Sequence, residues 1–308
     1  MRLARRSMLA AAGTLFAARA RAQDHVFLTY TQSELDRAYD QASWAPARAA
    51  VIARYATDSA VVRRAIPPRT ESYGSSDAEQ LDIFAPRDPG RVPIHVFIHG
   101  GAWTSLSKDD CSAPAPTFVD VGAIYIALGF ANIPAVRLPD MVGQCRRALG
   151  WIHAHAASFG GDADSIHVSG HSSGGHLAAV MATTDWAALG LPADLVKSTL
   201  LMSGIYDLHP AMLSSRRTYL KLTPDEIVAL SPLRHLDQLR GPVSIVVGDQ
   251  ESPEFKRQMN VMAEVLASTG ALRSRSLLFN QNHFEVPEQL NRPDSQVSRF
   301  ALTLMGLA

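Results

Sequence analysis

A glycine-rich stretch places a serine in the spacing Gly-x-Ser-x-Gly, at Gly170-His171-Ser172-Ser173-Gly174. The apolar run Ile166-His167-Val168 precedes it, and a helix-forming run from Leu177 to Ala182 follows it. Between a strand and a helix, this spacing is typical of a sharp turn that exposes the serine hydroxyl above the end of a sheet. Such a hydroxyl can attack a carbonyl carbon when a base removes its proton. Ser172 is therefore the predicted nucleophile.

A serine nucleophile needs a histidine base, which on a doubly wound sheet follows the last strand. Of the histidines after Ser172, His283 alone follows the last predicted strand. His209 and His235 fall in a long irregular segment, where a solvated surface histidine is the ordinary interpretation. We therefore expect His283 to be the base.

The carboxylate that orients the base is expected after the strand Val243–Val247, in Gly248-Asp249-Gln250-Glu251. Enzymes with such a sheet usually place the acid three residues after this glycine, which favours Glu251 over Asp249. One of the two is expected instead to be a capping or solvated carboxylate at the start of the helix that begins at Pro253. Asp207, after the preceding strand, is a third candidate that is better explained as a turn or cap residue.

An oxyanion-binding loop is predicted at His99-Gly100-Gly101-Ala102-Trp103, which follows the apolar run Val92–Ile98. Glycines at this place let backbone N–H groups turn toward a developing negative charge without a clash of Cβ atoms. Each such donor typically contributes on the order of 10²–10³ in turnover. The predicted oxyanion donors are the backbone N–H groups of Gly100, Gly101 and Ser173. The residues expected to line the substrate pocket are Trp103, Tyr206 and Phe284.

The elements that must position these residues are short apolar strands alternating with helical patterns. Strands are expected at 80–84 (an early edge strand), 92–98, 123–127, 166–168, 199–202, 243–247 and 274–279. Helices are expected at 33–39, 45–55, 141–157, 177–182 and 253–267, with a closing helix from about Asn291. This alternation predicts a mostly parallel sheet with helices on both faces. The early helices and the segment 208–240 are predicted to form a small helical lid.

Composition excludes several classes of function. The chain of 308 residues is 47% hydrophobic and 19% charged, with a formal net charge of zero, which suits one globular α/β domain. No basic stripe indicates nucleic acid, and no internal run approaches the roughly 18 apolar residues of a membrane helix. Phosphate-loop and dinucleotide motifs are missing from the sequence, and neither Cys111 nor Cys145 has the spacing of a metal site. No metal or cofactor is expected.

The first 22 residues have the organisation of an export signal. Arg2, Arg5 and Arg6 precede a short apolar segment at 8–18, and Ala20-Arg21-Ala22 fits a small-x-small cleavage site. Arg5 and Arg6 also resemble a twin-arginine signal. We therefore expect 1–22 to direct export and 23–308 to form a single domain in the periplasm or outside the cell; the alternative is an Arg-rich tail on a cytoplasmic protein. An oxidising periplasm would permit a disulfide between Cys111 and Cys145, although Cys145 falls in a helical pattern that favours a buried free thiol.

From about Tyr30 to the C-terminus the chain resembles the arylformamidase (kynurenine formamidase)-like α/β-hydrolases, a branch of the esterase/lipase group. The motifs that carry the resemblance lie at 34–36, 80–84, 99–103, 141–148, 159–162, 170–172, 252–258 and 283–284. The resemblance implies the α/β-hydrolase fold, with a twisted sheet and a helical lid. It also implies Ser172 as nucleophile, His283 as base and Glu251 as acid, although the animal enzymes carry Asp at that place.

The reaction expected from these residues is hydrolysis of a small carboxylic ester or aryl formamide through an acyl-enzyme. Ala102 replaces a frequently larger residue of the family loop, which would widen the acyl pocket. Two alternatives remain at this point. One is an arylformamidase that acts on N-formylkynurenine, and the other is a non-catalytic binding module on a hydrolase scaffold.

Overall fold

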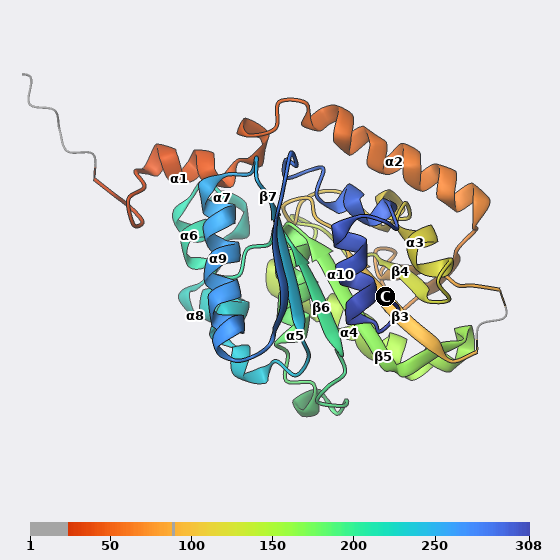
Figure 1. Cartoon of the computed structure of the whole chain (residues 1–308). Coiled ribbons are helices and arrows are strands. Elements are labelled where there is room, and N and C mark those ends of the chain that lie inside the picture. Colours follow the sequence, from red (N-terminus) through yellow and green to blue (C-terminus); the bar gives the residue numbers. More distant parts are fainter. Residues whose placement is uncertain (1–23, 88–89) are drawn as a thin grey trace, which may run out of the picture.

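A computed structural model describes residues 24–87 and 90–308, so the predicted export segment lies outside the described residues. Eight strands form one sheet in the order β1-β2-β4-β3-β5-β6-β7-β8 (Figure 1). The strands are β1 (Arg69–Ser72), β2 (Gln80–Phe84), β3 (Val92–Ile98), β4 (Ile124–Leu128), β5 (Gly161–His171), β6 (Ser198–Met202), β7 (Val243–Gly248) and β8 (Leu272–Leu278).

The pairings from β4 to β8 are all parallel, and β2 alone runs in the opposite direction, pairing antiparallel with β1 on one side and with β4 on the other. The strand predicted at the edge, β2, in fact has a neighbour on each side, because β1 pairs with it and takes the edge. β1 was not predicted, because its four residues, Arg-Thr-Glu-Ser, are polar and largely exposed and so lack an apolar pattern.

Helices cover both faces of the sheet, as predicted. The helices are α1 (Gln32–Tyr39), α2 (Arg48–Ala65), α3 (Ala115–Val119), α4 (Leu138–His155), α5 (Ser173–Ala182), α6 (His209–Leu213), α7 (Arg217–Leu220), α8 (Pro224–Ala229), α9 (Pro253–Ser268) and α10 (Gln296–Leu304). Residues of α4, α5 and α9 pack in one core cluster, whereas residues of α3 and α10 pack in a second one. Alternate residues of β4 belong to the two clusters, because successive side chains of a strand point to opposite faces.

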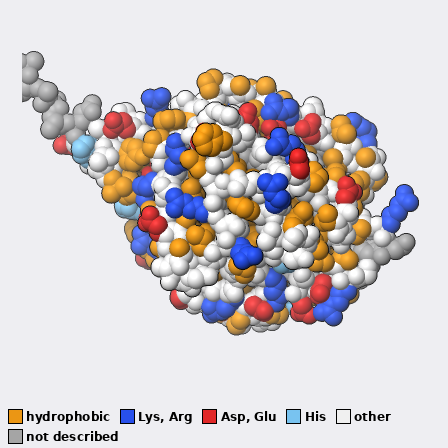
Figure 2. All heavy atoms as spheres, in the orientation of Figure 1, with side chains coloured by type: hydrophobic (Ala, Val, Ile, Leu, Met, Phe, Trp, Pro, Cys, Tyr) orange, Lys and Arg blue, Asp and Glu red, His pale blue; other side chains and the backbone are white. Residues whose placement is uncertain are grey.

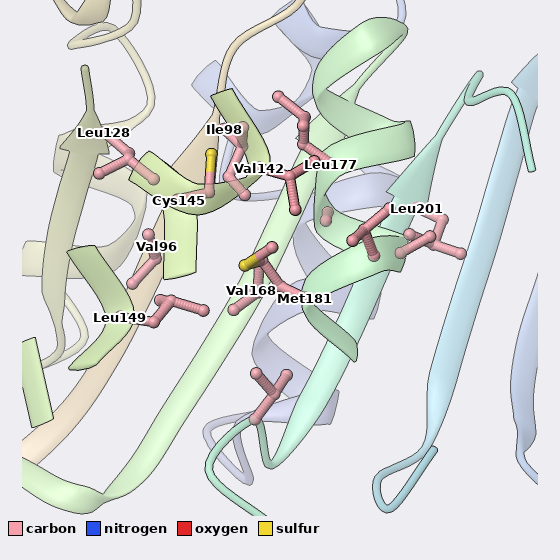
Figure 3. Close-up of a cluster of buried hydrophobic side chains, with 14 of the residues drawn as sticks. Val96, Ile98, Leu128, Val142, Cys145, Leu149, Val168, Leu177, Met181 and Leu201 are labelled. Carbon is pink, nitrogen blue, oxygen red and sulfur yellow. The ribbon is translucent and has the colours of Figure 1, made fainter. Parts of the chain in front are cut away.

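The larger core joins the central strands to α4 and α5. Figure 3 shows these buried apolar side chains meeting between the sheet and the two helices. Cys145 of α4 lies in this core, and Cys111 lies in the core on the other face. Both cysteines are buried and free, so they form no disulfide with each other.

α2 extends ten residues beyond the predicted end at Tyr55 and crosses the top of the molecule in Figure 1. The Tyr55 hydroxyl donates a hydrogen bond to the carbonyl oxygen of Phe284, which joins α2 to the loop after β8. Nearer its end, Arg63 pairs at 2.5 Å with Asp82, a buried carboxylate on β2. These contacts hold α2 over the carboxyl edge of the parallel strands, where the predicted lid lies.

The surface carries mixed charge. On the face that Figure 2 shows, Lys and Arg side chains are interspersed with Asp and Glu. Within the described residues, no helix combines the length and the apolar character that crossing a bilayer requires.

Candidate active site

Ser172 stands at the turn between β5 and α5 with φ 56° and ψ −120°, a strained conformation for a residue with a side chain. The turn is tight enough that a Cβ on Gly170 would lie 2.1 Å from the carbonyl oxygen of Gly174. A larger residue at position 170 would therefore force the turn open. The N–H of Ser172 donates to Met202 on the neighbouring strand at 2.9 Å, which anchors the turn to the sheet.

The structure brings Ser172, His283 and Glu251 into one hydrogen-bonded row. His283 Nε2 lies 2.8 Å from Ser172 Oγ, and His283 Nδ1 lies 2.6 Å from Glu251 Oε2. All three residues are buried, with exposed fractions of 5%, 4% and 1% for Ser172, His283 and Glu251. A carboxylate can only accept, so Nδ1 carries the proton and Nε2 is left free to accept the hydroxyl proton of Ser172.

The carboxylate of Glu251 is fixed from its other side as well. Its Oε1 accepts hydrogen bonds from the Ser203 hydroxyl at 2.5 Å and from the N–H of Gly248 at 2.8 Å. Ser203 directly follows β6 and has a positive φ of 51°. No motif in the sequence indicates this role of Ser203, because only the side-by-side arrangement of β6 and β7 brings its hydroxyl to the carboxylate of Glu251.

The two alternative carboxylates make other contacts. Asp249 Oδ1 accepts from the N–H of Gln281 at 3.2 Å and thereby braces the loop that carries the histidine. Asp207 accepts from the N–H of His209 at 3.1 Å, as expected for a turn residue. Neither Asp249 nor Glu251 caps the next helix, because the side chain of Ser252 caps α9, and Asp249 is instead a partly exposed carboxylate.

The glycine loop after β3 adopts an unusual backbone beside Ser172. Gly101 has φ 102°, and a Cβ there would lie 2.0 Å from the carbonyl oxygen of Ser105. Ala102 and Trp103 also have positive φ values, of 55° and 62°. The N–H groups of Gly100, Gly101 and Ser173 donate to no other group among the described residues. Of these three residues, Gly101 also lines the cavity at Ser172.

A cavity of about 320 Å³ opens at Ser172 and His283. Its wall combines the oxyanion-loop segment with the predicted lid, and includes Tyr39, Asp40, Gln41, Ala42, Ile52, Tyr55, Gly101, Ala102, Thr104, Ser105, Leu106, His171, Arg216 and Phe284. The lid residues come from α1, α2 and the segment before α7, so both predicted lid segments reach the site.

Of the three predicted pocket residues, only Phe284 lies in this wall. Trp103 is 1% exposed, and its Nε1 donates to His176 Nδ1 at 3.3 Å. Tyr206 is 0% exposed, and its hydroxyl accepts from the N–H of Gly204 at 3.1 Å. Each large ring thus finds a polar partner inside the core, which explains why neither reaches the cavity.

The other histidines near Ser172 are buried and brace the site. Burial lowers the pKa of His99 and of His176 to about 4, and burial together with the neighbouring His283 lowers that of His171 well below the usual value. His99 Nδ1 donates to the carbonyl oxygen of Gly100 at 2.9 Å and thereby braces the glycine loop. Within residues 24–87 and 90–308, His, Cys, Asp and Glu form no group of three that could hold a metal ion.

Comparisons with known proteins identify the family of the chain. Residues 81–265, more than half of the chain, match the model of the family described as BD-FAE. A kynurenine formamidase of Danio rerio is 29% identical over 90% of this chain and 97% of its own length. One from Salmo salar is 31% identical over 76% of this chain and 80% of its own length.

A solved structure shows the same likeness. A proposed thioesterase from Silicibacter sp. TM1040 superposes with a TM-score of 0.76 at 27% identity, covering 87% of this chain and 98% of that one. The parallel sheet, the strained serine turn and these relatives point to one conclusion. The chain is an arylformamidase-like α/β-hydrolase and belongs to the BD-FAE family.

Proposed function

We propose that this hydrolase cleaves small carboxylic esters or aryl formamides through an acyl-enzyme, with Ser172 as nucleophile, His283 as base and Glu251 as the orienting acid. The observation that carries the proposal is the continuous row of hydrogen bonds at the cavity, of 2.8 Å from Ser172 to His283 and 2.6 Å from His283 to Glu251. A nucleophile, its base and the group that orients the base are thereby in mutual contact.

The reaction begins when Ser172 Oγ attacks the substrate carbonyl carbon and His283 Nε2 takes the hydroxyl proton. The Glu251 carboxylate stabilises the imidazolium that forms and keeps its ring oriented. His283 then gives the proton to the leaving alcohol or amine as the tetrahedral intermediate collapses. Water, deprotonated by the same imidazole, attacks the acyl-enzyme and releases the acid.

The oxyanion of each tetrahedral intermediate would be bound by the backbone N–H groups of Gly100, Gly101 and Ser173. These groups donate to no other described residue, so they need not break an existing hydrogen bond to receive the charge. Preorganised donors of this kind are the largest single contribution in many acyl-transfer enzymes. The positive φ values of the glycine loop would therefore serve to hold backbone donors ready for the oxyanion.

The substrate class follows from the cavity and from the relatives. A cavity of about 320 Å³ suits a ligand of small size, and the rings of Tyr39, Tyr55 and Phe284 in its wall suit an aromatic one. Relatives named kynurenine formamidase support an aryl formamide as the alternative to a simple ester. Both substrates would present a carbonyl carbon to Ser172. The ester would release an alcohol, and the aryl formamide would release an aryl amine.

The decisive experiment compares kcat/KM on short p-nitrophenyl esters with kcat/KM on N-formylkynurenine. Ser172→Ala should abolish turnover of both substrates and labelling by an organophosphonate probe. Ser268→Ala, which changes an exposed serine at the end of α9, is the matched control and should behave as wild type. Wild-type turnover in Ser172→Ala would overturn the mechanism, and a protein that hydrolyses neither substrate would favour the binding-module alternative.

A further inference from the structure

A buried arginine lies in the wall of the cavity that holds Ser172. Arg216 is only 9% exposed and lines this cavity. Its Nη2 donates to the carbonyl oxygen of Tyr39 at 2.7 Å, and its Nη1 donates to the hydroxyl of Tyr219 at 3.2 Å. Its Nε is buried and has no partner among the described residues. Nη1 and Nη2 each carry a second N–H that has no acceptor among the described residues, so the guanidinium keeps unused donors besides the enclosed Nε.

No carboxylate of the described chain neutralises this charge, because none lies within 4.0 Å of Arg216. Its protein partners are neutral oxygens and two aromatic rings, with the guanidinium carbon 5.6 Å from the ring centre of Tyr39 and 5.7 Å from that of Trp103. A buried cation without a counter-ion is costly to keep. Aromatic faces offset only part of that cost.

The surrounding structure holds the guanidinium in place. The hydroxyl of Tyr39 donates to the buried carboxylate of Glu254 at 2.9 Å, which fixes the ring beneath the arginine. Trp103 belongs to the glycine loop beside Ser172, so the guanidinium packs against the loop that flanks the predicted nucleophile. Arg216 itself immediately precedes α7 in the lid.

Among the described residues that line the cavity, Asp40 is the one Asp, Glu, Lys or Arg besides Arg216. Unlike Arg216, Asp40 is exposed. Its carboxylate oxygens accept from the N–H of Ala42 at 3.1 Å and from the hydroxyl of Ser43 at 2.7 Å. Asp40 is therefore solvated and already engaged at the surface. The interior of the cavity is left with a positive charge.

We infer that Arg216 binds a carboxylate on the substrate, so that the preferred substrates are small aryl esters or aryl formamides that carry an anionic carboxylate. The planar fork of a guanidinium matches a carboxylate in geometry as well as in charge. This inference rests on the proposed function and narrows its substrate class. The carboxylate would supply the counter-ion that the folded chain does not.

Two pairs of probes test this inference, namely 3- and 4-acetoxybenzoate and the corresponding acetoxybenzamides. Within each pair the acyl group and the shape are almost the same, and only one member is charged. The readout is the ratio of kcat/KM for the benzoate to that for the benzamide, taken on the better isomer. Comparing this ratio between variants cancels the intrinsic reactivity of the two phenol leaving groups.

Arg216→Met should lower the ratio by about 10- to 100-fold, because a hydrogen-bonded charge pair is lost, and mainly by raising KM for the benzoate. Arg216→Lys keeps the charge without the fork and should give an intermediate ratio. Arg217→Met, the same substitution at the exposed neighbour, should leave the ratio unchanged. Benzoate should also inhibit wild type competitively and more strongly than benzamide, and Arg216→Met should remove this difference.

The inference is overturned if Arg216→Met depresses the two substrates equally, which is the result expected of a purely structural arginine. An unchanged ratio with wild-type rates overturns it as well. A failure of the proposed function looks different, because then neither the benzoate nor the benzamide is turned over by wild type. If Arg216→Met does not fold, Arg216→Lys and the inhibition of wild type by benzoate still decide the outcome.

Discussion

His171 Nε2 lies 2.8 Å from the carbonyl oxygen of His283. Since a carbonyl can only accept, the imidazole of His171 donates this hydrogen bond. His171, which directly precedes Ser172, thereby holds the backbone of His283, whose own ring contacts Ser172. The two rings also lie in contact, with centres 4.7 Å apart. The lowered pKa of the buried His171 keeps it neutral and preserves the donor tautomer.

We predict that His171 acts as a positioning residue. His171→Leu leaves the carbonyl oxygen of His283 without its donor and should lower kcat by about 10- to 100-fold, because small misplacement of a base is costly. KM should change little. His171→Gln offers an amide N–H to the same carbonyl and should recover most of the loss. Equal damage in the Leu and Gln variants would instead indicate a packing role.

The choice between the two carboxylates of the loop after β7 can be tested by isosteric substitution. Glu251→Gln should lower kcat by about 10³–10⁴, since an amide cannot stabilise the imidazolium and favours the wrong tautomer. Asp249→Asn keeps the oxygen that accepts from Gln281 and should retain kcat within about threefold. The measurement is kcat on a p-nitrophenyl ester, with circular dichroism to check the fold. Comparable loss in both variants would contradict the assignment of Glu251.

A methyl group at Gly101 should disrupt the glycine loop. Gly101→Ala would bring a Cβ to 2.0 Å from the carbonyl oxygen of Ser105, so the loop must move and its N–H groups with it. We expect kcat to fall by about 10²–10³, together with the melting temperature.

Gly122→Ala is the matched control for Gly101→Ala. Gly122 has a similarly positive φ of 84°, but a Cβ there meets nothing within 4 Å. Gly122→Ala should lower the free energy of unfolding by about 1–2 kcal/mol and leave kcat unchanged. A normal kcat in Gly101→Ala would show that the loop does not bind the oxyanion.

The protein should lose stability in mild acid because five buried histidines resist protonation. Burial lowers the pKa of each, to about 3 or 4 where a value is resolved, and these residues are His95, His99, His167, His171 and His176. The unfolded chain, with histidine pKa values near 6.5, binds more protons below that pH, so the free energy of unfolding falls as the pH drops from about 6.5 toward 4. Each of these histidines lowers the free energy of unfolding by up to about 2 kcal/mol at pH 5.

Melting temperatures from pH 7.5 to 4.5 measure this effect and should decline steeply below pH 6.5. His95→Phe keeps the stacking on Phe118, whose ring centre is 4.0 Å away, and removes one titrating group. The melting temperature of His95→Phe should therefore decline less steeply with falling pH than that of wild type. His155→Gln, at an exposed position, should not alter the slope. A melting temperature constant from pH 7.5 to 5 would contradict the prediction.

Much of the fold could be predicted because local patterns record it. The expected strands at 92–98, 199–202 and 243–247 agree with β3, β6 and β7 to within one residue, since strands buried on both faces read as continuous apolar runs. The closing helix starts at Gln296, five residues later than expected, because a short 3₁₀ turn, Pro287–Asn291, comes first. Patterns are weakest where an element is short or polar, as in β1.

The sequence by itself determined the order of chemical groups along the chain, with a glycine loop first, then Ser172, then an acid and His283. Each follows a recognisable strand, and parallel strands bring their carboxyl ends to one edge, so order along the chain became proximity in space. Only the tertiary structure decided which carboxylate reaches His283 and that Arg216 lies in the cavity wall. The first contact depends on how the loops after β7 and β8 lie against each other, and the second on how the segment 208–240 and the early helices pack over the sheet. Neither arrangement produces a periodic pattern in the sequence.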